Sequence, residues 1–123
     1  EEGIEYVCDW CNDDQPYPMK VKSGSLVALP YTVELNDIPV YLVQHHRSPE
    51  LFERAKDHFD TLSREGAESA RIMCVSTHPY ITGAAHRIKY YDQIFEYIRR
   101  HDDVVFMTGS EILDWYTEEM TSQ

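Results

Sequence analysis

The second half of the chain alternates segments of helical periodicity with short, continuous apolar runs. Apolar residues recur every three to four positions over residues 48–66 and again over 84–100, and a third such segment starts at residue 110. The runs between them, "ARIMCVST" (70–77) and "DVVFMT" (103–108), have the composition of strands buried on both faces. Helix, strand, helix, strand, helix is the order of βαβ units, so the pattern predicts a parallel sheet in an α/β fold.

Capping residues mark the ends of the expected helices. Ser48 with Pro49 predicts a helix start, and that helix should run to about Gly66. A second helix is predicted over residues 84–100, and Ser110 is expected to cap a last one, "EILDWYTEEM". The side chains expected to face inward are Leu51, Phe52, Ala55, Phe59 and Leu62; Ile88, Tyr91, Ile94, Phe95 and Ile98; and Ile112, Leu113, Trp115 and Tyr116.

The first part of the chain is less regular. "IEYV" (4–7) predicts a short strand, and residues 8–18 predict a loop rich in Asn, Asp and Pro. "MKVKSGSLVALPYTVEL" is typical of two extended pieces around Ser23-Gly24, which predicts a short hairpin near residues 19–35. The opening "EEG" resembles a helix end with Gly3 as its C-cap. We therefore expect residues 1–123 to form a single domain that is a portion of a larger α/β barrel.

The charge balance argues against two classes of partner. Twenty-two Asp and Glu against eleven Lys and Arg give a net charge of −11, and such a surface repels phosphate backbones and anionic lipid. We therefore expect neither nucleic acid nor membrane as a partner. No apolar run approaches the roughly 20 residues that span a bilayer, and the first residues do not resemble a signal peptide. An odd number of cysteines, three, argues against a disulfide framework and favours a cytoplasmic location.

Two candidate metal or redox sites are weak. Cys8 and Cys11 have C-x-x-C spacing, but a redox pair should open a helix and a four-cysteine zinc site needs a second pair. We expect two small, half-buried side chains there. His45 and His46 are adjacent and point in different directions in most backbones, so we expect surface histidines ahead of a helix.

Asp9 and His78 form a stronger candidate. Each directly follows a predicted buried strand, so in a parallel sheet both should lie at its carboxyl edge, where α/β folds place their chemistry. A carboxylate that holds an imidazole fixes its tautomer and stabilises its charged form. Trp10 could supply an apolar wall, and Asp13 and Asp14 polar groups at the mouth of a pocket. The alternative is that Asp9 caps a turn and His78 merely begins a loop.

Four motifs in order carry a family resemblance. "DWCNDDQPY", "LVALPYTVELNDIP", "STHPYITGAAHR" and "VVFMTGSEILDWY" resemble the carboxy-terminal half of polysaccharide deacetylase-type proteins, in the subgroup of peptidoglycan deacetylase-like and allantoinase-like enzymes. The resemblance covers nearly the whole chain. It implies a distorted (β/α)₇ barrel of roughly twice this length, with mainly parallel strands.

The resemblance also implies an activity, the hydrolysis of an N-acetyl amide at a divalent metal. Asp9-Trp10 would match the motif whose aspartate orients the catalytic histidine, and His78 the histidine that protonates the leaving amine. The other residues expected to shape the substrate groove are Trp10, Asp13, Asp14, Tyr17, Tyr80 and Arg87. The metal, with zinc expected, would be held by an Asp-His-His set in an amino-terminal half, so we expect no metal ligands in this chain. Taken alone, the chain is expected to be inactive.

Two departures leave the substrate open. Ser76-Thr77-His78 replaces the usual Leu-x-His, and the loop continues as His-Pro…Gly…His-Arg. The main hypothesis is a hydrolase that acts on the N-acetyl group of a glycan. The alternatives are an allantoinase-like hydrolase of a small cyclic amide, even a metal-independent one, and a non-catalytic module. The expected partners are a glycan or small-molecule substrate, the amino-terminal half of the same barrel and a second copy of the chain.

Overall fold

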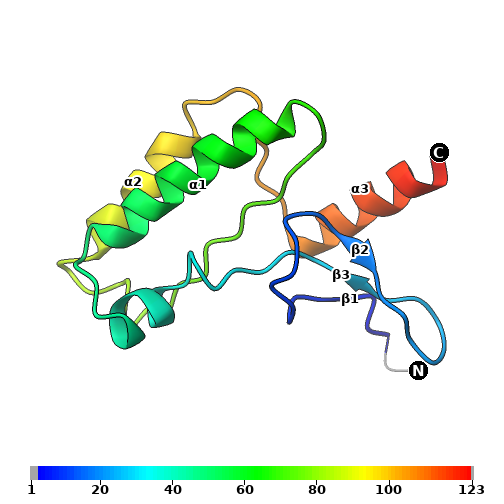
Figure 1. The fold of residues 1–123 in the computed structure, drawn as a ribbon, viewed down its shortest axis with the longest axis horizontal. Coiled ribbons are helices and arrows are strands. Elements are labelled where there is room, and N and C mark those ends of the chain that lie inside the picture. The colour runs from blue at the N-terminus through cyan, green and yellow to red at the C-terminus, as the bar shows by residue number, and fades with distance from the viewer. Residues whose placement is uncertain (1–2, 123) are drawn as a thin grey trace. The chain divides into compact units, whose positions relative to one another are not determined.

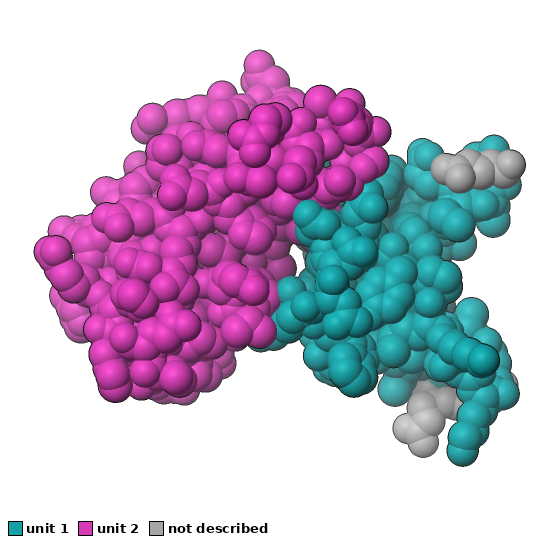
Figure 2. All heavy atoms as spheres, viewed as in Figure 1, with its two compact units in different colours: residues 1–31, 105–123 teal, residues 32–104 magenta. Residues whose placement is uncertain are grey.

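The computed structural model describes residues 3–122, which form short strands and helices in two compact units (Figure 1). The first unit holds the residues up to Tyr31 and those from Val105 on, and the second holds residues 32–104 (Figure 2). Small strands and helices together agree with the predicted α/β class. That residues 1–123 form a single domain stays a prediction.

The first unit contains a small mixed sheet in the order β1-β3-β2. β1 (Tyr6–Val7) pairs parallel with β3 (Val27–Ala28), and β2 (Tyr17–Pro18) pairs antiparallel with the other side of β3. The turn between β2 and β3 contains Gly24 at φ 75°, a conformation that glycine adopts without strain. The structure thus confirms an antiparallel pair around the predicted turn. The paired residues are 17–18 and 27–28, so the paired region is shorter than the hairpin predicted near residues 19–35.

A capping box begins α3 (Gly109–Ser122) in the same unit. The Glu111 backbone N–H donates to Thr108 Oγ1 at 3.3 Å, and Glu111 Oε2 accepts from the Thr108 backbone N–H at 2.6 Å. Each side chain therefore satisfies a backbone donor of the other residue. The prediction that Ser110 is the cap was wrong by two positions, because Ser110 already lies inside the helix.

The predicted inward face of α3 is only half-buried. Ile112, Leu113 and Tyr116 have intermediate exposure, and Trp115 is 38% exposed. No described residue of α3 is buried. Replacing Trp115 should therefore cost less than removal of a fully buried aromatic ring, about 3–5 kcal/mol.

The second unit is built on α1 (Glu50–Gly66) and α2 (Ile88–Ile98), which lie side by side in Figure 1. A six-residue π-helix, η1 (Ile38–Val43), precedes α1. The sequence predicts α1 to within two residues at its start, although the N-cap is Pro49 and makes no side-chain cap. The buried core of this unit comprises Leu35, Val40, Tyr41, Leu51, Ala55, Phe59, Ile81, Ile94 and Ile98.

α2 begins four residues later than predicted. The carbonyl of Ala84 accepts from the backbone N–H groups of both Arg87 and Ile88, at 2.8 and 3.0 Å, so residues 84–87 form a turn. Ile94 and Ile98 face the core as expected, but Ile88 is 38% exposed. Helical periodicity therefore located the buried face and overestimated the length of the helix.

Both predicted buried strands were wrong. Residues 71–77 are half-buried and residue 70 is exposed, and an isolated parallel bridge joins Asn36 and Ser76. Over residues 103–108 the structure assigns no strand, and Val105 is 77% exposed. A strand needs a continuous hydrogen-bonded ladder beside it, and an apolar composition does not supply one.

Candidate active site

A buried carboxylate lies at the centre of the candidate site in the second unit. Asp37 has no solvent-accessible surface, and three donors contact its two oxygens. Oδ1 lies 2.7 Å from His78 Nδ1, while Oδ2 accepts from the His78 backbone N–H and from the Thr82 hydroxyl, both at 2.7 Å. A buried charge with this many short hydrogen bonds has a fixed position.

An isolated parallel bridge between Asn36 and Ser76 brings Asp37 and His78 together. Asn36 lies between a turn and Asp37, the N-cap of η1, and Ser76 lies in the extended stretch before His78. The Ser76 backbone N–H donates to the Leu35 carbonyl at 3.0 Å, and the Asp37 N–H donates to the Ser76 carbonyl at 3.1 Å. Asp37 directly follows Asn36 and His78 lies two residues after Ser76, so the bridge brings their side chains together. The predicted place of His78 at the carboxyl edge of a parallel sheet stays a prediction.

A tight turn after His78 supplies the third donor. The His78 carbonyl accepts from the N–H groups of Ile81 and Thr82, at 2.9 and 3.0 Å, which directs the Thr82 hydroxyl to Asp37. Gly83 completes the turn, and a Cβ atom at this position would collide with the carbonyl oxygen of Pro79. A residue with a side chain cannot occupy that position unless the turn shifts.

The hydrogen bonds keep Asp37 ionised. Burial alone would raise the pKa of this carboxyl, but the hydrogen bonds from the His78 backbone, the imidazole and Thr82, with the charge of His78, together hold the pKa below its ordinary value of 3.8. An ionised carboxylate can only accept hydrogen bonds, so His78 Nδ1 carries the proton that points at Asp37. The free ring nitrogen is therefore Nε2. The His78 side chain is 35% exposed, which leaves it accessible to a substrate.

The carboxylate that contacts His78 differs from the one that the sequence predicts. Asp37 holds Nδ1 of His78, and the sequence prediction did not name Asp37. Asp9 is exposed and belongs to the first unit, and its predicted pairing with His78 stays a prediction. Local sequence gives little sign of Asp37, since Asn36-Asp37 before Pro39 is typical of a simple turn.

Two more predicted site residues, Tyr80 and Arg87, follow His78 in the sequence. The Tyr80 ring is 5.7 Å from the imidazole in an edge-on arrangement, and Tyr80 is 73% exposed. Arg87 contacts the protein itself: Nη1 donates to the Ile81 carbonyl at 3.3 Å, and its guanidinium carbon lies 4.6 Å above the ring of Tyr41. Substrate binding by Tyr80 and Arg87 stays a prediction.

The remaining predicted residues lie in the loop before β2. Trp10 is 53% exposed. Asp13 Oδ1 accepts from the backbone N–H groups of Asp14 and Gln15, at 2.8 and 3.3 Å, and therefore stabilises the loop. Tyr17 Oη accepts from the side-chain amide of Asn12 at 2.7 Å. Their predicted part in substrate binding, with that of Asp14, is untested.

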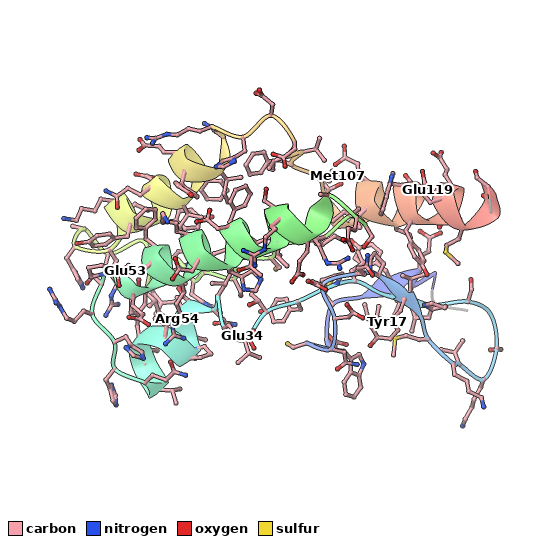
Figure 3. All side chains as sticks on the ribbon, turned by 45° about the horizontal axis from the view of Figure 1, so that its top comes forward. Tyr17, Glu34, Glu53, Arg54, Met107 and Glu119 are labelled. Atoms are coloured by element: carbon pink, nitrogen blue, oxygen red, sulfur yellow. The ribbon has the colours of Figure 1, made fainter. Side chains whose placement is uncertain are left out.

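The described residues do not supply a metal site. Between residues 3 and 122, no three His, Cys, Asp or Glu side chains are placed to hold an ion. The expectation that Cys8 and Cys11 are half-buried was wrong, since both are exposed. His46, exposed as predicted, accepts from Arg54 Nη2 at 3.0 Å and lies 3.6 Å from Glu50 (Arg54 is labelled in Figure 3). None of the described helices is both long and apolar enough to cross a membrane.

Comparison with known proteins gives three relevant similarities. No protein-family model matches the sequence. A Schizosaccharomyces pombe protein named "Putative polysaccharide deacetylase" is 31% identical in an alignment over 115 residues that covers 85% of this chain and 36% of that protein. Among solved structures, PuuE allantoinase superposes with a TM-score of 0.86 and 30% identity over 92% of this chain and 38% of its own.

The third similar protein is a probable polysaccharide deacetylase from Pseudomonas aeruginosa PAO1. It superposes with a TM-score of 0.86 and 27% identity over 93% of this chain and 39% of its own. The chain thus spans less than two fifths of the length of each of these three proteins.

Proposed function

Because the chain belongs to the polysaccharide deacetylase-type proteins, we propose that it supplies the general acid of a hydrolase that cleaves a C–N bond. It would form the carboxy-terminal half of the family's distorted (β/α)₇ barrel, and an amino-terminal half would complete the substrate groove. The similarity of two deacetylases and an allantoinase over most of the chain supports the reaction class.

His78 would act through Nε2. After water adds to the amide carbonyl, the C–N bond breaks and the departing nitrogen needs a proton. A protonated His78 donates that proton from Nε2 and becomes neutral. Asp37 would hold the Nδ1–H throughout, fix the orientation of the ring and stabilise its charged form.

The contact between His78 and Asp37 is the observation that carries this proposal. The carboxylate accepts from the side chain and from the backbone of the same histidine, so it fixes both the ring and the peptide that bears it. A histidine that only begins a loop has no need of a buried carboxylate with three donors, whose isolated burial would be costly. The alternative in which His78 has no chemical role is therefore disfavoured.

The described residues do not fit a complete catalytic metal centre, so we derive no step through a metal. If the whole enzyme uses a divalent ion such as zinc, its ligands would come from the amino-terminal half. This chain would contribute the proton donor and one wall of the groove, with Trp10, Tyr17 and Tyr80 as candidate aromatic contacts.

We propose two candidate substrate classes. An N-acetylated glycan is favoured by the two relatives named as polysaccharide deacetylases. A small cyclic amide is the second candidate, because PuuE allantoinase superposes equally well and Ser76-Thr77 replaces the usual leucine-containing motif.

The test uses the full-length protein that contains this chain. Turnover is measured on N-acetylated glycans and on allantoin, with and without a chelator, for the wild type, His78→Ala, and His58→Ala on α1 as the matched control. We expect His78→Ala to lower turnover by roughly 10²–10⁴, the usual contribution of a general acid, and His58→Ala to change it little. A His78→Ala variant that folds and keeps wild-type turnover would refute the assignment.

A further inference from the structure

Arg87 makes two contacts that join the two sides of the candidate site. One side is the turn that follows His78, and the other is η1, which begins directly after Asp37. Arg87 Nη1 donates to the carbonyl of Ile81 in the turn at 3.3 Å. Its guanidinium carbon lies 4.6 Å above the ring of Tyr41 in η1.

Each contact is held by further interactions. Ile81 is 1% exposed, and the next residue, Thr82, donates its hydroxyl to Asp37. Tyr41 is 4% exposed, and its hydroxyl donates to the carbonyl of Ser48 at 2.8 Å. Burial raises the pKa of this hydroxyl, so the ring stays a neutral phenol beneath the cation. Both contacts of Arg87 therefore rest on residues that cannot move independently of the core.

The geometry is not that of an arginine placed for stability alone. Arg87 Nε is buried and has no hydrogen-bond partner among the described residues. An unsatisfied buried donor reduces stability, and an apolar side chain could fill the same space without that cost. A planar cation, in contrast, can stack on a ring and donate to a carbonyl at the same time.

We propose that Arg87 is the positioning residue of the His78–Asp37 pair: it binds the turn that carries His78 to the π-helix that follows Asp37. In this role Arg87 does not touch the substrate. It limits the opening of the contact between Nδ1 and the carboxylate, and its link to turnover rests on the function proposed above.

The test reads the contact directly. In ¹⁵N-labelled full-length protein, the His78 Nδ1–H signal is identified by its loss in His78→Ala. Its exchange with water is then measured in Arg87→Met and Arg87→Lys. We expect exchange about tenfold faster in Arg87→Met, because the cation–π contact and a charged hydrogen bond are both lost. Arg87→Lys should fall in between, and Arg99→Met, which removes an exposed cation at the end of α2, should match the wild type.

Turnover separates positioning from substrate binding. If Arg87 is a positioning residue, Arg87→Met should lower kcat by about tenfold to hundredfold, as expected when a reacting group is displaced, and should change KM little. A folded Arg87→Met variant with wild-type exchange would overturn the proposal, whatever its KM. If Arg87→Met does not fold, the same comparison is made with Arg87→Lys, and wild-type exchange there overturns the proposal. If the wild type hydrolyses none of the substrates, the proposed function fails, and the exchange data still decide the role of Arg87.

Discussion

Asp37→Asn should destabilise the protein strongly although it changes only one atom of the side chain. The carboxylate accepts three hydrogen bonds, each 2.7 Å long. An asparagine keeps one acceptor and turns an NH₂ group toward the remaining donors. If its oxygen faces His78 Nδ1–H, the buried backbone N–H of His78 is left without an acceptor. In the other orientation, His78 must change tautomer.

The magnitude follows from these losses. A hydrogen bond to a charged group contributes about 1.5–3 kcal/mol, and a buried donor left unsatisfied costs about 1–3 kcal/mol. Since the amide retains part of the contacts, we expect the free energy of unfolding at pH 7 to fall by about 3 kcal/mol. The exposed Asp57→Asn on α1 is the control and should change it by less than about 0.5 kcal/mol.

The difference in stability between the wild type and Asp37→Asn should depend on pH in a defined direction. The pKa of Asp37 is lower in the folded protein than its ordinary 3.8, so its contribution to stability is complete above that value. As the pH falls below 3.8, the contribution decreases and is lost when the pH passes the folded pKa. Denaturant unfolding of the wild type and of Asp37→Asn between pH 7 and pH 2.5 should therefore show free energies of unfolding that converge in acid. Equal stability at pH 7, or a gap that widens in acid, would refute this account of the buried carboxylate.

Two further changes test the local structure. Gly83→Ala should lower the free energy of unfolding by about 1–3 kcal/mol and reduce turnover, because the new Cβ meets the Pro79 carbonyl. Gly66→Ala has open space around it and should be neutral or stabilising. Thermal unfolding compares the two variants, and equal stability would contradict the predicted collision at Gly83. Thr108→Ala should destabilise α3 by about 1 kcal/mol through loss of the capping box, whereas Thr108→Ser should restore most of it, as measured by denaturant unfolding. A Thr108→Ala variant as stable as the wild type would show that the box does not hold the helix end.

Elements defined by local signals were predictable from the sequence. α1 has a proline at its start and an apolar stripe, and both act within one or two turns of helix. The turn at Gly24 has a positive φ, a conformation that glycine adopts easily, so the glycine in the sequence already indicates the turn. The runs 70–77 and 103–108 were not predictable in the same way, because strand formation depends on which backbone lies beside them.

Of the two residues of the candidate site, the sequence predicted His78 and did not predict Asp37. His78 follows an apolar run, and this position pointed to a sheet edge. Its partner Asp37 lies 41 residues earlier, and no periodicity or spacing links the two. The sequence offered Asp9 as a plausible carboxylate, and the contact of Asp37 with His78 appears only in the three-dimensional structure. The motif "LVALPYTVELNDIP", one of the four that carry the family resemblance, contains Asp37.

The isolated bridge between Asn36 and Ser76 has a consequence for folding. It joins segments about forty residues apart, so the chain must close a long loop before the carboxylate meets its donors, and contacts of this kind form late. A slip by one position would present Asn36 or Ile38 to His78 and leave the charge of Asp37 buried without compensation. The contacts of Asp37 with His78 and Thr82 therefore favour the native register of the two segments, so the residue proposed for proton transfer also contributes to the alignment of the chain.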